Sequence, residues 1–209
     1  MVSSAVRKYA ALCMVCLCSS LFFLGLYQFN NKYSQNTIQA ANGILALSEE
    51  ELQKSPVRFL VSGWAFYPDA LLTPEEIQDE SHYMRYLSIG EQTNFSSPAS
   101  PSPYGCGTYQ MTFFLPERKE TYALEIPEVF SAYNLYLDYD LILQMGEPAQ
   151  RTPLVQNRMV TFHGGKPVTL TIAVSNYDHF YGGIVYPPAF GTMLAVNTTR
   201  GIRFAFCLF

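Results

Sequence analysis

The sequence predicts an all-β domain, folded as a β-sandwich and preceded by one N-terminal transmembrane helix. Apolar and polar residues alternate in several short runs that are separated by turn signals rich in glycine and proline. One uncharged segment near the N-terminus is long enough to cross a bilayer, and no long amphipathic helical pattern occurs after it. A chain of 209 residues that is 49% hydrophobic and 14% charged is long enough to bury one such core.

The uncharged segment is residues 9–29, which hold 21 residues without a charge. A helix of that length, at about 1.5 Å per residue, matches the roughly 30 Å hydrocarbon core of a bilayer. Arg7 and Lys8 precede it and Lys32 alone follows closely, so the positive-inside rule places residues 1–8 in the cytoplasm. We therefore predict a plasma-membrane protein with a single N-terminal anchor and its bulk extracytoplasmic.

A cleaved signal peptide is the competing interpretation of this segment, because it also combines a basic start with an apolar core. The core of a signal peptide is usually ~7–15 residues long and ends at a cleavage site of small residues. Here the apolar run is longer and meets Asn30, Asn31 and Lys32. On this ground we favour an uncleaved anchor.

The charge and the cysteines exclude some classes of protein. A formal charge of -4 and a pI near 5.4 argue against a nucleic-acid partner. Three of the five cysteines lie in the anchor, where Cys13 and Cys16 form a C-x-x-C that faces lipid or a helix partner more readily than a metal. Cys106 and Cys207 remain, and spacing alone predicts no disulfide between them. We predict no metal and no cofactor.

Residues 30–56 are the predicted juxtamembrane segment. Within it, Ser48 followed by Glu51 is a capping-box pattern, which predicts a short helical turn that Pro56 ends. A second helical turn is predicted inside the domain at residues 73–76, where threonine, proline and two glutamates follow one another.

The β-sandwich is predicted over residues 57–196. Its centre is the stretch 121–143, which we interpret as a hairpin of two apolar-rich strands joined by a short aromatic segment, with Pro127 ending the first strand. Asp138 and Asp140 fall at alternate positions of the second strand, so their carboxylates should share one face, which we expect to be solvated. The other predicted strands cover residues 58–67, interrupted at Gly63, and residues 107–115, 158–162 and 168–176.

Two loops differ from the rest in composition. Residues 91–107 carry too many serines, prolines and glycines for a regular element and predict an exposed loop. Residues 177–188 combine tyrosines, a phenylalanine, a histidine and an aspartate with glycines and prolines, which indicates a structured loop. Asn94 and Asn197 begin N-glycosylation sequons, a short and common pattern.

Residues 197–209 end in a purely apolar run that follows Arg200 and Arg203. We predict the start of a second membrane span here, and expect the chain to be the front part of a longer membrane protein. A final buried strand is the alternative, because a short apolar run does not distinguish the two.

The sequence offers little support for an enzyme. It has no G-x-S-x-G, H-E-x-x-H, P-loop or G-x-G-x-x-G motif, and its three histidines lie far apart. Asp178 beside His179 could act as an acid–base pair, although loop residues that support turns are the commoner case. A glycosidase needs paired carboxylates, for which we find no suitable spacing. We predict no catalysis in this chain.

The candidate binding residues are centred on the loop 177–188. Sugar-binding sandwiches place aromatic rings against the apolar face of a pyranose, while a few polar groups bind its hydroxyls. With 15 tyrosines and 15 phenylalanines an aromatic cluster also arises by chance, and core packing is the alternative, especially for Trp64. The predicted ligand-binding residues are Asn176, Tyr177, Asp178, His179, Tyr181, Tyr186, Trp64 and Tyr133, the last together with Ser131 and Asn134 of the central hairpin.

Four stretches in order carry a resemblance: GWAFYPDALLTP (63–74), GCGTYQMTF (105–113), LEIPEVFSAYNLYLD (124–138) and VSNYDHFYGGIVYPPAFGT (174–192). Together they resemble the extracellular jelly-roll domain of bacterial sensor proteins of the 7TMR-DISM type, and the membrane-anchored sensor histidine kinases that share it. The resemblance implies a galactose-binding-like jelly roll outside the cell, followed by membrane spans and a kinase or cyclase module that this chain does not contain. The family often has an Asn-Gly turn where this chain has residues 138–140, so the turn there is expected to be displaced or longer.

The leading hypothesis is a ligand-sensing input domain of a two-component or similar signal-transduction receptor. Its predicted partners are the plasma membrane, a small-molecule or saccharide ligand and a second copy in a homodimer. A cell-surface carbohydrate-binding or protein-interaction module without a signalling role is the alternative.

Overall fold

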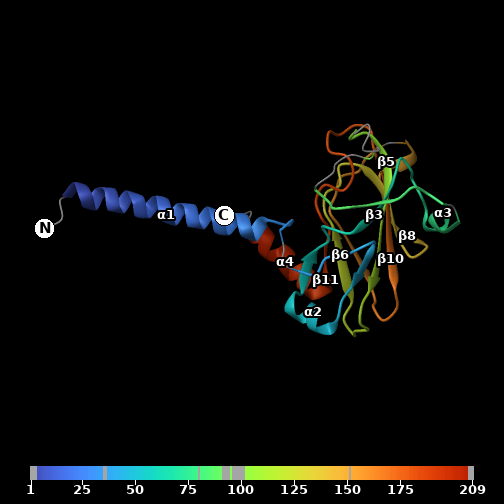
Figure 1. The fold of residues 1–209 in the computed structure, drawn as a ribbon, viewed down its shortest axis with the longest axis horizontal. Coiled ribbons are helices and arrows are strands. Elements are labelled where there is room, and N and C mark those ends of the chain that lie inside the picture. The colour runs from blue at the N-terminus through green and yellow to red at the C-terminus, as the bar shows by residue number, and fades with distance from the viewer. Residues whose placement is uncertain are drawn as a thin grey trace. The chain divides into compact units, whose positions relative to one another are not determined.

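The computed structural model describes residues 4–34, 37–79, 81–90, 95, 102–150 and 152–206. They form two compact units, Met1–Ser34 and Gln35–Phe209, which we call the N-terminal unit and the sandwich unit. The N-terminal unit contains α1 (Ser4–Asn30), which extends the predicted segment at both ends (Figure 1). Among the described residues, α1 is the helix long and apolar enough to cross a membrane or to serve as a signal sequence.

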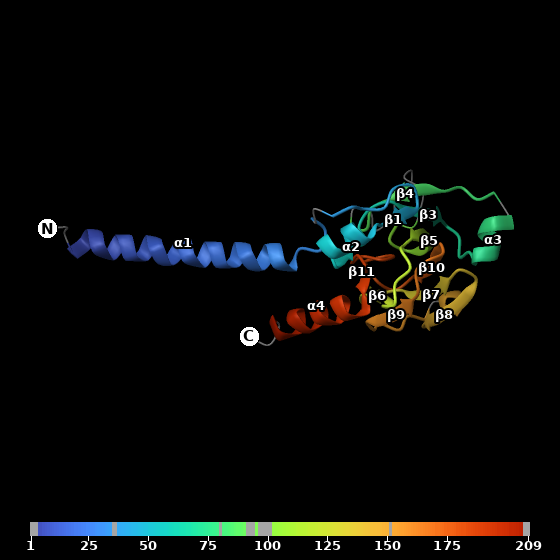
Figure 2. The same ribbon diagram turned by 90° about the horizontal axis from the view of Figure 1, so that it is seen from below.

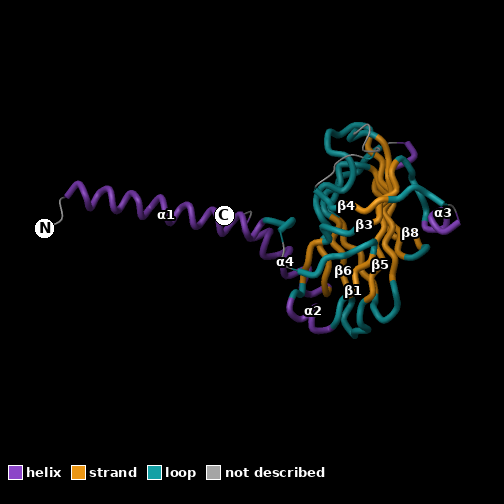
Figure 3. Tube along the Cα trace, in the orientation of Figure 1, coloured by secondary structure: helices purple, strands orange, loops and turns teal. Residues whose placement is uncertain are grey.

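The sandwich unit consists of two β-sheets packed on a common core, so the predicted β-sandwich is confirmed (Figure 3). Sheet A has the order β4-β3-β5-β10-β7-β8, and β1 pairs in parallel with the end of β5. Sheet B has the antiparallel order β2-β11-β6-β9. The strands are β1 (Ile44–Ala46), β2 (Val57–Phe59), β3 (Trp64–Pro68), β4 (Arg85–Leu87), β5 (Gly105–Phe114), β6 (Tyr122–Ile126), β7 (Ala132–Leu137), β8 (Asp140–Met145), β9 (Arg158–Phe162), β10 (Val168–Asn176) and β11 (Ala189–Thr192).

The chain crosses repeatedly between the two sheets, which corrects two predicted elements. The predicted central hairpin is wrong, because β6 lies in sheet B and β7 in sheet A, and residues 127–131 cross between them. The predicted strand 58–67 is likewise divided between β2 in sheet B and β3 in sheet A. Gly63 marks that crossing with a φ of 80°, and a Cβ there would collide with the Ala40 backbone.

A tight hairpin occurs one strand later, between β7 and β8. Leu137 pairs with Asp140, so Asp138 and Tyr139 form a two-residue turn, neither displaced nor longer than usual. Asp138 has a φ of 54°, which aspartate tolerates better than most residues, and its carboxylate accepts a hydrogen bond from the Thr169 N–H at 2.8 Å. Asp138 and Asp140 therefore do not share a strand face as predicted, because one belongs to the turn.

The core lies between the sheets and is formed by the inward rows of the strands. Trp64 on β3 and Tyr133 on β7 both belong to it and are 0% exposed. The Trp64 indole N–H donates to the Leu60 carbonyl at 2.9 Å. Period-two alternation places both side chains on the inner face, so neither reaches a ligand at the surface and we reassign both to the core.

Both predicted helical turns are present and both have reciprocal caps. Before α2 (Glu49–Lys54), the Ser48 hydroxyl accepts from the Glu51 N–H and the Glu51 carboxylate accepts from the Ser48 N–H. The same two bonds join Thr73 and Glu76 before α3 (Pro74–Asp79). The bonds from Ser48 hold the pKa of the Glu51 carboxyl below its usual value.

Two boundaries of the sandwich unit differ from the prediction. β1 pairs with β5, so the sheet already includes part of the predicted juxtamembrane segment 30–56. At the other end, β11 leads directly into α4 (Met193–Phe206), a helix of 14 residues that the sequence patterns did not predict (Figure 2). The alternative of a buried strand at residues 197–206 is therefore wrong, whereas a second membrane span beginning there stays a prediction. Cys207 and Asn94 lie outside the described residues.

Candidate functional site

Four aromatic rings gather where the loops 127–131 and 177–188 meet, and we call them the aromatic cluster: Phe130, His179, Phe180 and Tyr181. The rings of Phe130 and His179 stack with centroids 4.5 Å apart and planes inclined by 12°. Tyr181 lies 5.6 Å from His179, and Phe180 meets Tyr181 edge to face at 5.5 Å. Phe180 is 73% exposed and Tyr181 46%, so the cluster presents an aromatic surface to solvent.

Asn176, the last residue of β10, holds the start of the loop 177–188 in place through its side chain. Its side-chain amide donates to the carbonyl groups of Pro103 at 2.8 Å and of His179 at 2.6 Å. Its Oδ1 accepts from the His179 N–H at 3.1 Å. Asn176 is 3% exposed, so these bonds replace solvent for its own amide group. Asn176 positions the aromatic cluster and does not itself face a ligand.

The ring of His179 has a defined role in the loop. Its Nδ1 accepts a hydrogen bond from the Tyr181 N–H at 3.1 Å. An imidazole that accepts at Nδ1 is neutral and carries its proton at Nε2. His179 thus offers one N–H donor beside the aromatic surface, and Asp178, which is exposed, offers a carboxylate acceptor next to it.

Two glycines let the far side of the loop pack closely on sheet A. A Cβ at Gly182 would collide with the Pro103 carbonyl, and one at Gly183, whose φ is 75°, would collide with the Tyr109 hydroxyl. The Tyr109 hydroxyl bonds the backbone of Ile184, and burial raises the pKa of Tyr109 to about 12. The loop is therefore held at its start by Asn176 and closely packed in its middle, and its exposed rings lie between these two points.

The structure brings together part of the predicted site. His179 and Tyr181 are in the aromatic cluster, and Asp178 lies beside them in the chain. Tyr177 is half-buried and Tyr186 is 38% exposed, both in the same loop. Trp64, Tyr133 and Ser131 are buried, and Asn134 lies half-buried on the outer face of sheet A, on the strand β7 rather than in either loop.

Sequence reasoning missed Phe130, which supports the stacked ring of His179. The pairing of Ala132 with Ser175 brings the start of β7 beside the end of β10, and so places Phe130 next to the loop 177–188. That pairing joins strands far apart in the sequence, so no local pattern indicates it. Among the described residues, no group of three or more His, Cys, Asp or Glu side chains is arranged to hold a metal ion.

Solved structures with this fold include sandwich domains of much longer proteins. A glycosyl hydrolase family 2 (GH2) member from Bacteroides cellulosilyticus DSM 14838 is 12% identical, with a TM-score of 0.52 over 66% of this chain and 21% of that chain. A Parabacteroides merdae β-glucuronidase, solved with glycerol in its active site, is 12% identical, with a TM-score of 0.51 over 66% and 21%. The apo β-glucuronidase 3 of Bacteroides uniformis is 12% identical, with a TM-score of 0.51 over 66% and 22%.

This chain spans about a fifth of the length of each of those proteins. No model of a protein family and no curated protein matches the chain. At 12% identity the likeness establishes the fold, a β-sandwich shared with domains of GH2 proteins.

Proposed function

We propose that this chain is a non-catalytic binding module held outside a membrane by α1, and that its aromatic cluster receives a saccharide. The observation that carries the proposal is the cluster itself. The exposed ring of Phe180 or of Tyr181 offers an apolar face to a pyranose, and the His179 N–H and the Asp178 carboxylate suit its hydroxyl groups.

The fold supports this proposal. The chain alternates between two sheets in the manner of jelly-roll sandwiches, and sandwich domains of the same shape occur in the GH2 proteins above. Those proteins include β-glucuronidases, which act on glycosides, but only about a fifth of their length matches this chain. We therefore infer saccharide recognition without hydrolysis, as an accessory role in binding.

The membrane location rests on α1, which is 27 residues long and carries no acidic residue. A helix of that length and composition suits a bilayer span, and Arg7 and Lys8 in its first turns support an extracytoplasmic sandwich unit by the positive-inside rule. A sensing role in a signal-transduction receptor stays a prediction based on the sequence resemblance.

Isothermal titration of the full chain in detergent micelles against neutral and acidic oligosaccharides tests the proposal. We expect one of these classes to bind, and Phe180→Ala and Tyr181→Ala to weaken its affinity about five- to a hundredfold, since stacking on an exposed ring contributes about 1–3 kcal/mol by analogy with bases on aromatic platforms. Tyr83→Ala is the matched control, because Tyr83 is 68% exposed but lies in another loop. If neither class of oligosaccharide gave a binding isotherm, the proposed saccharide binding would be contradicted.

A protein-interaction module is the second candidate, and the edge strand β8 favours it. Leu141 and Ile142 are 50% and 48% exposed on this strand, which pairs on one side only. A partner that adds a strand here would be lost on Ile142→Pro and retained on Tyr181→Ala, the reverse of the behaviour expected for a saccharide site.

A further inference from the structure

We propose that the outer face of α4 rests on the surface of a bilayer rich in anionic lipid. This inference depends on the proposed membrane location and adds a second contact with the same membrane. It is carried by the exposure and charge of α4, and by the place where the chain from α1 joins the sandwich unit.

One side of α4 packs on sheet B and the other is left in solvent. Val196 is 1% exposed, and the Arg203 guanidinium lies 4.5 Å from the centroid of the Phe59 ring on β2. On the other side Leu194 is 76% exposed and Phe204 is 67% exposed, about three helical turns apart. Soluble helices usually turn such side chains inward, so this side of α4 lacks the apolar neighbours that its composition favours.

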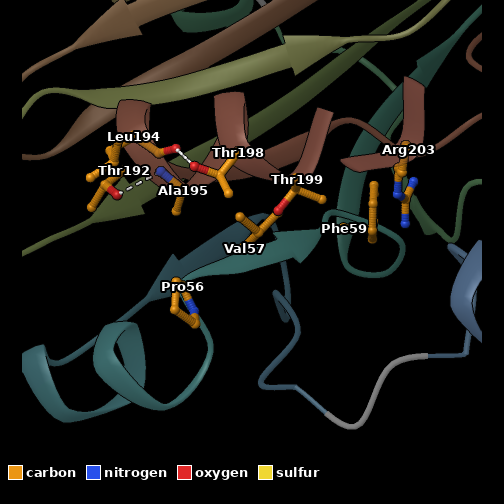
Figure 4. A pocket seen from close by; sticks show the side chains of 9 residues that line it. All are labelled: Pro56, Val57, Phe59, Thr192, Leu194, Ala195, Thr198, Thr199 and Arg203. Atoms are coloured by element: carbon orange, nitrogen blue, oxygen red, sulfur yellow. Dashed lines mark hydrogen bonds between the residues drawn. The ribbon is translucent and has the colours of Figure 1, made fainter. Parts of the chain in front are cut away.

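An open groove lies along the contact between α4 and β2 and adds to the apolar surface (Figure 4). Its open volume is about 640 Å³, with Val57 and Phe59 on the sheet side and Leu194 and Ala195 on the helix side. Arg203 lines the same groove. The apolar walls of this groove suit the acyl part of a lipid at the interface, whereas the Arg203 guanidinium already faces the Phe59 ring and the charge of Glu125.

The charge of α4 identifies the kind of surface. Its 14 residues include Arg200 and Arg203 and no acidic residue, whereas the whole chain has a formal charge of -4. A positive helix on a negative protein is attracted to anionic headgroups, while the rest of the chain is repelled. This distribution favours an anionic surface over a basic or neutral one, and the proposed anchor makes an anionic bilayer the occupant that we commit to.

The chain that follows α1 reaches the sandwich unit beside α4. Residues 31–39 join the end of α1 to Ala40, which is buried in the sandwich unit. The Arg58 guanidinium donates to the Ile38 carbonyl at 3.4 Å, and Arg58 is the neighbour of Phe59 on β2. Ile38 in this segment and Arg203 of α4 therefore both contact the short strand β2.

The length of that connection limits how far α4 lies from the membrane. A linker of nine residues spans at most roughly 30 Å, the length of a fully extended chain at about 3.5 Å per residue. Whatever the arrangement of the two units, this linker keeps Ala40 within that distance of the end of α1. Residues 31–39 thus raise the effective concentration of lipid around α4 once α1 is anchored, because a short linker keeps its two ends close together.

Quenching of tryptophan by brominated lipid tests this contact in the full chain. The chain has one tryptophan, Trp64, which is 0% exposed and gives a constant background. Leu194→Trp places a second tryptophan on the outer face of α4. Tyr86→Trp is the matched control, because Tyr86 is 50% exposed and lies on β4 of the other sheet. Both variants are reconstituted into vesicles of brominated phosphatidylcholine, with or without phosphatidylglycerol.

We expect the tryptophan at position 194 to be quenched in vesicles that contain phosphatidylglycerol, and the tryptophan at position 86 to remain unquenched. Adding Arg200→Gln should lower the ratio of docked to free α4 about fivefold, the effect of one basic residue near an anionic surface. Equal quenching at the two positions, or a quenching at 194 that is independent of phosphatidylglycerol, would overturn the inference. The inference would also be overturned if the tryptophan at position 194 were unquenched because a second copy or another protein covers α4.

Flotation of the same vesicles separates this inference from the proposed anchor. A chain that floats but shows no quenching at position 194 contradicts the α4 contact alone. A chain that does not float contradicts the anchor, and the α4 contact with it.

Discussion

Replacing Asn176 with alanine should release the loop 177–188 while the sandwich stays folded. The substitution removes three hydrogen bonds, two donated by the amide and one accepted by its oxygen. Each such bond contributes about 1 kcal/mol, and the carbonyl groups of Pro103 and His179 would lose a buried donor. We therefore expect a loss of about 3 kcal/mol, less than the 5–15 kcal/mol stability that is usual for a domain.

Hydrogen exchange and denaturant unfolding measure the two parts of this effect. Amide protons of residues 177–188 should exchange ten- to a hundredfold faster, because the loop can open without unfolding the sheets. Exchange in β5 and β10 should change little, since their pairing does not involve the Asn176 side chain. Saccharide affinity should fall with the order of the loop, because the rings of His179 and Tyr181 would no longer be held in place.

Asn134→Ala is the matched control for this prediction. The side-chain Oδ1 of Asn134 is buried without a hydrogen-bond partner in the part of the chain that the structure describes, so its removal should cost less than 1 kcal/mol. If Asn176→Ala proved as mild as Asn134→Ala, and exchange in the loop were unchanged, the role assigned to Asn176 would be refuted.

Three further predictions concern stability and are measured by denaturant unfolding of the full chain. Gly183→Ala should destabilise the fold by about 1–3 kcal/mol, because it puts a Cβ at positive φ against the Tyr109 hydroxyl. The control Gly201→Ala should be neutral or stabilising, because Gly201 in α4 has open space around it. Equal effects of the two substitutions would contradict the packing of the loop. Tyr133→Phe should cost nothing at neutral pH, since it removes a buried hydroxyl without a partner in the described residues. Burial raises the pKa of Tyr133 to about 12, so the stability of the wild type should fall between about pH 10 and pH 12, where this tyrosine loses its proton in the unfolded chain first. The variant should lose about 2–3 kcal/mol less over that range. Identical alkaline stability profiles would refute the prediction. Arg58→Met should destabilise the fold by about 2–4 kcal/mol and make residues 31–39 more sensitive to protease. The reason is that the buried guanidinium donates to three backbone carbonyl groups, one of them in that segment. Unchanged cleavage would show that Arg58 does not hold residues 31–39 on the sandwich unit.

The features that sequence predicted best are those set by a few neighbouring residues. The caps at Ser48 and Thr73 need only a hydroxyl and a glutamate three positions later, and both form with the expected bonds. The strand β10 has the bounds that its pattern indicated, because its large apolar residues recur at period two in a run rich in β-branched residues, which favours a strand. The loop 177–188 also lies where its glycines and prolines placed it.

Features that depend on distant pairing could not be predicted from the same patterns. Alternation shows which residues share a face of a strand, but not which sheet the strand joins, so β6 and β7 resembled a hairpin. Trp64 and Tyr133 were candidate ligand contacts because an aromatic residue on a strand suits either face. Phe130 was missed for the same reason, since its place beside His179 follows from the pairing of β7 with β10.

The arrangement of the candidate site and α4 makes the sensing hypothesis testable. The loop 177–188 continues through β11, a strand of four residues, directly into α4 (Figure 2). β11 pairs with both β2 and β6, so a shift of the loop is transmitted to α4 only if those pairs move as well.

If the chain is a sensor, a bound saccharide should change the quenching of Leu194→Trp by brominated lipid, and Tyr181→Ala should abolish the change along with binding. If it is a binding module alone, the saccharide should bind without altering the quenching, because the paired β11 holds α4 in place. Saturating saccharide with unchanged quenching would therefore refute sensing through α4 while leaving the proposed binding function intact.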